Sequence, residues 1–160
     1  MCESQAPGHD RLRGPIVVLI SLFLISNAYA QERPCARDEE LRASNEADTL
    51  RSWDALYKSY MLYRQCDDGS IAEGYSESVV RILVDRWSTL PRLATLARRN
   101  APFRRFVVNH HVDATVNCDD LEQIKMNANT QCPQNLGALC VDLAKEAGDA
   151  LKDCPWLGIR

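Results

Sequence analysis

Six of the seven cysteines of this 160-residue chain lie between Cys35 and Cys154, and they limit the possible folds more than any other feature. The seventh, Cys2, precedes an apolar run from residue 15 to residue 25. A membrane-spanning helix needs about 20 apolar residues, so this run is too short to span. It is followed by Ala28-Tyr29-Ala30, the small-x-small pattern that signal peptidases cleave. We therefore expect residues 1–30 to be a signal peptide, with an uncut anchor as the alternative, and residues 31–160 to form a single helical domain.

Cleavage after Ala30 would remove Cys2 and leave an even number of cysteines in a periplasmic or secreted protein, where disulfides form and persist. Six cysteines permit fifteen pairings. Position favours Cys35 with Cys154, which would join the two ends of the domain. It also favours Cys132 with Cys140, and Cys66 then remains for Cys118. Zinc is disfavoured because the chain has neither Cys-x-x-Cys nor paired Cys and His spacing. We expect no cofactor and no metal.

The first part of the mature chain has apolar residues at helical spacing. One helix is expected over 38–64, with a stripe that runs from Leu50 to Met61. The segment 66–70, which contains Gly69, breaks the pattern. A second helix, about 71–87, is apolar over most of its circumference, which is typical of a helix in the middle of a bundle.

The rest of the chain continues with helices, and no stretch alternates strictly between apolar and polar residues as a strand would. Pro91 and Pro102 predict the first turns of a third and a fourth helix, which form a tight antiparallel hairpin. The fourth is expected to turn Phe103, Phe106 and His110 inward. A fifth helix starts near Asp119, and a sixth covers about 134–152. The predicted fold class is all-α, a compact bundle of about six helices with disulfides.

Arginine is concentrated in one part of the sequence, although the formal charge of the whole chain is −3. Between Arg81 and Arg105 lie seven arginines and one acidic residue, Asp85, a local excess of six positive charges. Guanidinium groups form bidentate bonds with carboxylates and phosphates, and arginine is enriched at interfaces. A set of solvated helix faces is the plainer alternative. We expect a protein partner with an acidic surface, no nucleic acid and no membrane span after cleavage; the predicted contact residues are Arg92, Arg98, Arg99, Arg104 and Arg105.

His110 and His111 are the first candidates in the sequence for a metal or proton-transfer site, and Asp113 follows closely. Neighbouring helix positions point about 100° apart, so the two imidazoles cannot easily bind one metal from the same face. We expect His110 to be a core histidine with a hydrogen-bond partner. No serine-nucleophile signature and no phosphate-binding glycine loop occurs in the sequence. We therefore predict no catalytic residues, and a small metal-dependent hydrolase centred on this pair is kept as an alternative.

Three segments resemble a group of uncharacterised exported bacterial proteins that are entirely helical: Trp53–Tyr60, Cys66–Ser76 and Phe103–Val108. The resemblance implies a fold but no activity and no site residue. In architecture, a signal peptide followed by a small disulfide-bonded helical domain is also similar to the periplasmic immunity proteins that neutralise amidases delivered by type VI secretion. The resulting hypothesis is an exported binding or inhibitor protein, immunity-like, with an envelope structural or maintenance protein as the alternative.

Overall fold

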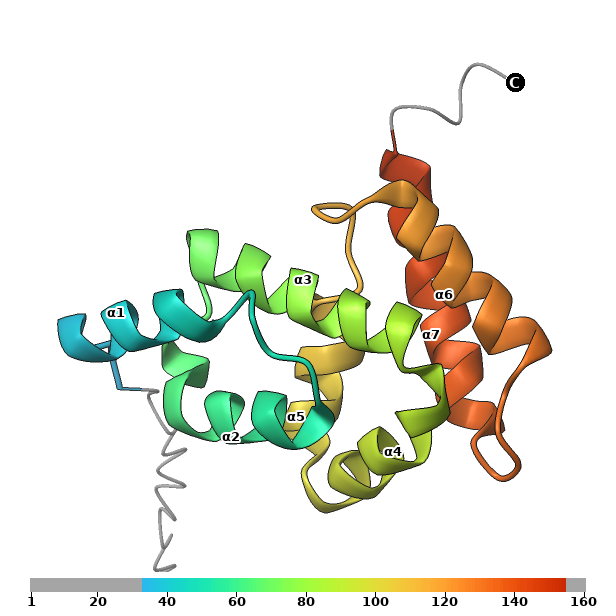
Figure 1. Cartoon of the computed structure of the whole chain (residues 1–160), viewed down its shortest axis with the longest axis horizontal. Coiled ribbons are helices and arrows are strands. Elements are labelled where there is room, and N and C mark those ends of the chain that lie inside the picture. Colours follow the sequence, from blue (N-terminus) through green and yellow to red (C-terminus); the bar gives the residue numbers. More distant parts are fainter. Residues whose placement is uncertain (1–32, 155–160) are drawn as a thin grey trace, which may run out of the picture. The chain divides into compact units, whose positions relative to one another are not determined.

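The computed structural model describes residues 33–154, which contain helices and turns and no strand (Figure 1). The predicted all-α class is confirmed. The described residues contain seven α-helices: α1 Arg37–Glu46, α2 Trp53–Tyr63, α3 Gly69–Asp85, α4 Leu90–Arg99, α5 Ala101–Arg105, α6 Cys118–Thr130 and α7 Gly137–Ala150. Shorter turns extend them: 3₁₀ turns at Arg64–Cys66, Trp87–Thr89 and Leu151–Asp153, and a π-helical turn at Phe106–His110. The predicted signal peptide, 1–30, lies outside the described residues.

Helix α3 is the centre of the fold, as its nearly continuous apolar surface predicts. It packs against α1, α2 and α6, and its fully buried residues include Tyr75, Val79 and Leu83. Asp68 caps its start by accepting a hydrogen bond from the backbone N–H of Gly69. Figure 1 shows α3 lying between α1 and α6. Among the helices of residues 33–154, none combines the length and the apolar character that a membrane crossing requires.

The single helix expected over 38–64 is wrong, because the structure divides it into α1 and α2. Ser52 adopts an extended conformation, and its hydroxyl accepts a hydrogen bond from Ala55 N–H, which starts a new helix. The link is also tied to α3: Ser78 Oγ donates to Ala47 O and accepts from Leu50 N–H. In the link, these bonds to Ser78 take the place of the backbone hydrogen bonds that a continuous helix would make. The apolar stripe from Leu50 to Met61 therefore belongs to α2 and to the residues just before it, and not to α1.

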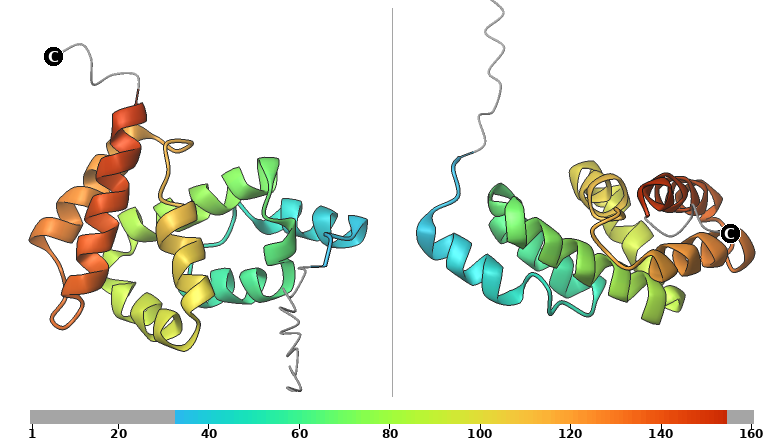
Figure 2. Two further views of the ribbon diagram at one scale, coloured as in Figure 1. Left: turned by 180° about the vertical axis from the view of Figure 1, so that it is seen from behind. Right: turned by 90° about the horizontal axis from the view of Figure 1, so that it is seen from above.

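Among the described residues, three disulfides join Cys35 to Cys66, Cys118 to Cys154 and Cys132 to Cys140. The predicted Cys132–Cys140 pair is confirmed, whereas the pairs Cys35–Cys154 and Cys66–Cys118 are wrong. The Cys35–Cys66 bond connects the two ends of the α1–α2 pair, and the Cys118–Cys154 bond connects the two ends of the α6–α7 pair. Neither bond joins the two ends of the domain. Helices α6 and α7 lie side by side (Figures 1 and 2), which brings the start of α6 to the end of α7.

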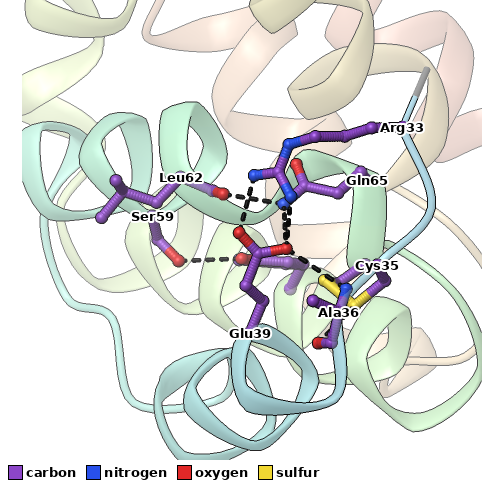
Figure 3. The surroundings of a disulfide bond; sticks show 9 residues. Arg33, Cys35, Ala36, Glu39, Ser59, Leu62 and Gln65 are labelled. Carbon is purple, nitrogen blue, oxygen red and sulfur yellow. Dashed lines mark hydrogen bonds and ion pairs between the residues drawn. A yellow bond between two sulfur atoms is a disulfide. The ribbon is translucent and has the colours of Figure 1, made fainter.

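The Cys35–Cys66 bond lies within a polar cluster centred on Glu39 of α1 (Figure 3). Arg33 forms two hydrogen bonds with the Glu39 carboxylate, at 2.6 and 2.7 Å. Gln65 donates to the same carboxylate at 3.1 Å, and so does the backbone N–H of Ala36 at 3.2 Å. The hydrogen bonds from Arg33 hold the pKa of Glu39 down at about 2. This cluster holds the segment before α1 against the turn that follows α2.

Candidate functional site

The arginine-rich segment forms α4 and α5, which only Asn100 separates. Asn100 leaves the helical conformation, and its side-chain oxygen caps α5 by accepting from Phe103 N–H at 2.9 Å. Phe103 is fully buried against Tyr57 and Tyr60 of α2, with ring centroids 4.9 and 5.2 Å away. This aromatic contact fixes α5 and so positions the arginines that follow Phe103.

Two of the five predicted contact arginines bond to carboxylates of the protein itself. Arg92 forms a bidentate pair with Asp54 of α2, and the bonds from Arg92 lower the pKa of Asp54. Arg104 pairs with Asp142 of α7. Both pairs are substantially exposed, and such pairs contribute little to stability. Their main effect is to hold the guanidinium groups in place.

The other three, Arg98, Arg99 and Arg105, are exposed and have no carboxylate partner among residues 33–154. Arg98 makes only a long hydrogen bond, 3.4 Å, to the hydroxyl of Thr95. We call these three residues the unpaired arginines. The structure does not bring all five arginines to one point, because Arg92 pairs with α2 whereas Arg98 and Arg104 line a pocket.

This pocket, the α4–α7 pocket, has a volume of about 240 Å³. Its lining comes from α4, α5, and the turn and first residues of α7: Ala94, Ala97, Arg98, Arg104, Asn135, Leu136, Ala138 and Leu139. Arg98 and Arg104 were predicted from the sequence as contact residues, whereas the wall formed by residues 135–139 was not. The sequence does contain one indication of this wall. Pro133 and Gly137 lie between Cys132 and Cys140, which are eight residues apart, and this pattern indicates a constrained turn.

The expected inward position of His110 is wrong: His110 is exposed, and His111 is buried with 2% of its surface accessible. The cause is the π-helical turn at Phe106–His110, in which hydrogen bonds span five residues and one extra residue enters the turn. The residue that lies one turn after Phe106 is therefore His111. Their rings meet edge to face with centroids 4.2 Å apart.

His111 is the middle of a buried polar network. Its Nδ1 lies 3.0 Å from Ser76 Oγ of α3, and its Nε2 lies 3.2 Å from Asp67 Oδ2. Ser76 also donates its hydroxyl proton to Asp113 Oδ2 at 2.8 Å. Asp113 in turn accepts from the backbone N–H of Thr115 at 2.9 Å. The network ties the 111–117 segment to α3 and to the turn before it.

Asp67, His111 and Ser76 follow the order carboxylate, imidazole, hydroxyl that activates serine nucleophiles in hydrolases. Here Ser76 is 1% exposed, and its proton is directed to Asp113 instead of to the imidazole. The geometry therefore favours a structural role for the network, in which it holds α3 against the 111–117 segment. Among the described residues, no three His, Cys, Asp or Glu side chains are grouped as metal ligands would be. Cys118, close to the histidine pair in sequence, forms a disulfide.

Comparisons with known proteins add no assignment: no protein family, no curated protein and no solved structure matches this chain.

Proposed function

We propose that this protein is an exported binding or inhibitor module, immunity-like, that recognises an acidic surface of a protein partner through α4 and α5. The observation that carries the proposal is the state of the unpaired arginines. In an acidic protein with more Asp and Glu than Lys and Arg, Arg98, Arg99 and Arg105 have no carboxylate partner within residues 33–154, and they lie close together in sequence.

The disulfides support export, since such bonds form and persist outside the reducing cytosol. Three bonds in a domain of this size also favour a rigid scaffold, and a rigid scaffold loses little conformational entropy on binding. Arginine is suited to this role because its planar guanidinium group bonds carboxylates in bidentate fashion and is weakly hydrated.

The test is affinity capture from an envelope extract on immobilised protein, with identification of the retained proteins by mass spectrometry. The variant reverses the unpaired arginines, R98E, R99E and R105E. The matched control reverses three exposed cations on other helices, R37E on α1, K58E on α2 and K125E on α6, so that both variants change the net charge equally.

We expect wild type and control to retain the same acidic protein and the arginine variant to lose it. Retention of that protein by all three forms would contradict the proposal. Equal loss from both variants would contradict it too, because binding would then depend on net charge and not on α4 and α5.

A further inference from the structure

We propose that the α4–α7 pocket is the anchor of this interface and that it takes one acidic side chain of the partner, next to an apolar residue in the partner's sequence. The inference rests on the proposed function, since it names the group that the partner presents. Four features of the pocket lead to it: its volume, its lining, the surface beside it and the rigidity of one wall.

The volume limits the ligand. Pockets for small molecules and cofactors usually measure about 300–1,000 Å³. The α4–α7 pocket, at about 240 Å³, is smaller than that range but has room for one side chain. Anchor residues of protein partners fill sites of this kind, in which a single buried side chain carries much of the affinity.

The lining determines the chemistry of that side chain. Buried Ala94, Ala97 and Leu139 form an apolar base, and the small alanines leave the space open. Arg98 and Arg104 provide the charge. The bond to Asp142, which is not a lining residue, holds Arg104 in position, whereas Arg98 has no carboxylate partner in the described part of the chain. A carboxylate on an apolar stem satisfies both parts of this lining.

An exposed apolar side chain extends the site. Val141 is 67% exposed, the highest value among the large exposed hydrophobic residues of the described chain. It follows Ala138, which lines the pocket, by three helix positions, so the two lie on the same face of α7. An apolar residue beside the acidic anchor can therefore cover Val141.

The wall at 135–139 is held in place before a partner arrives. The Cys132–Cys140 bond closes the turn, and Asn135 adopts a left-handed conformation with φ of 65°. A wall that is already ordered adds little to the entropic cost of binding. The anchor site is thus built from a stapled loop and two helices.

Nuclear magnetic resonance titration of the full mature protein tests the inference with two defined probes, acetyl-Leu-Glu-Leu-amide and acetyl-Leu-Gln-Leu-amide. The glutamate peptide is expected to shift the backbone amides of Ala97, Ala138 and Leu139. The glutamine peptide, which has nearly the same shape and no charge, should bind at least tenfold more weakly. Equal affinity for both peptides, or shifts elsewhere only, would overturn the proposal.

Two arginines, Arg98 and Arg86, provide the matched variants. Arg98→Gln removes a pocket charge and is expected to weaken the glutamate peptide at least tenfold. Arg86→Gln removes the same charge at an exposed position between α3 and α4, outside both the pocket lining and the predicted contact residues, and should change the affinity less than twofold. Equal weakening by both variants would show a diffuse electrostatic effect and reject the pocket.

The outcomes separate this inference from the proposed function. Loss of the captured partner on reversal of the unpaired arginines, combined with equal effects of Arg98→Gln and Arg86→Gln, supports the proposed function and rejects the pocket. Selective binding of the glutamate peptide, combined with capture that ignores the reversal, supports the pocket and rejects the function.

Discussion

His111 lies within hydrogen-bonding distance of partners at both ring nitrogens, and it is the residue through which α3, the turn at Asp67 and the 111–117 segment are joined. His111→Leu replaces the imidazole with an apolar side chain of similar volume. It leaves the buried Ser76 hydroxyl and the Asp67 carboxylate without this partner. Breaking such buried polar contacts costs about 3 kcal/mol in the free energy of unfolding. Urea denaturation of purified protein measures it.

His110→Leu is the control for that change, since the side chain of His110 is exposed. It should alter the free energy of unfolding by less than about 0.5 kcal/mol. If His110→Leu were the costly substitution and His111→Leu the neutral one, the π-helical turn and the network built on it would be wrong.

Glu39 gives the fold a dependence on acid. Because the pKa of Glu39 lies at about 2, below its ordinary value, its contribution is present at neutral pH and is lost as the pH falls toward 2. Arg33→Gln removes the main cause of that lowering. The stability difference between wild type and Arg33→Gln should be largest above about pH 5 and should vanish near pH 2. A difference that stays constant from pH 7 to pH 2 would show that Arg33 does not act through Glu39.

At the scale of elements, the close approach of α3 to the link between α1 and α2 depends on a glycine. A Cβ atom added at Gly74 would lie 2.9 Å from the Cβ of Ala47 and 3.1 Å from Asp48 N. Gly74→Ala must push the two segments apart, which costs about 1–3 kcal/mol. Gly148 in α7 is the matched position, because an added Cβ meets only the flexible Lys125 side chain, at 3.5 Å or more.

Gly148→Ala is therefore expected to stabilise the protein by about 0.5–1 kcal/mol through helix propensity alone. Thermal unfolding of the two alanine variants should give opposite shifts in Tm relative to wild type. Shifts of the same sign would show that the contact between Gly74 and Ala47 is looser than the structure has it.

The Cys132–Cys140 bond is expected to matter for stability and for the pocket wall. A disulfide of this loop length contributes about 2.5 kcal/mol by restricting the unfolded chain. Replacing both cysteines with alanine should lower the free energy of unfolding by about that amount and weaken the glutamate peptide several-fold, with the helical circular dichroism retained. Unchanged peptide affinity in a folded variant would show that the 135–139 wall keeps its shape without the Cys132–Cys140 bond.

At the scale of the whole molecule, the helical class and the central place of α3 follow from sequence because apolar periodicity is a local property. The helix break at Ser52 could not be predicted from this periodicity. It depends on the hydroxyl of Ser78, distant in sequence, which hydrogen-bonds to the link between α1 and α2. The exchange of His110 for His111 depends on one π-helical turn, which no periodicity signals. Two disulfide pairs were wrong because they depend on which helices pack side by side.

The candidate site was predictable only in part for the same reason. The arginine excess of the α4–α5 segment is visible in the sequence, but its division into paired and unpaired residues depends on Asp54 and Asp142, which other helices supply. The pocket itself needs the 135–139 wall, which packing alone brings to α4.

Site-specific photo-crosslinking in intact cells can show whether a partner contacts the α4–α7 pocket. A photoreactive residue replaces Val141 beside the pocket or, as the matched control, Leu41 of α1, which is 59% exposed. We predict an adduct with one acidic protein from position 141, none from position 41, and loss of the adduct when Arg98, Arg99 and Arg105 are reversed to glutamate. An adduct from position 41 alone, or one from position 141 that survives the reversal, would show that the partner does not bind at the pocket through these arginines.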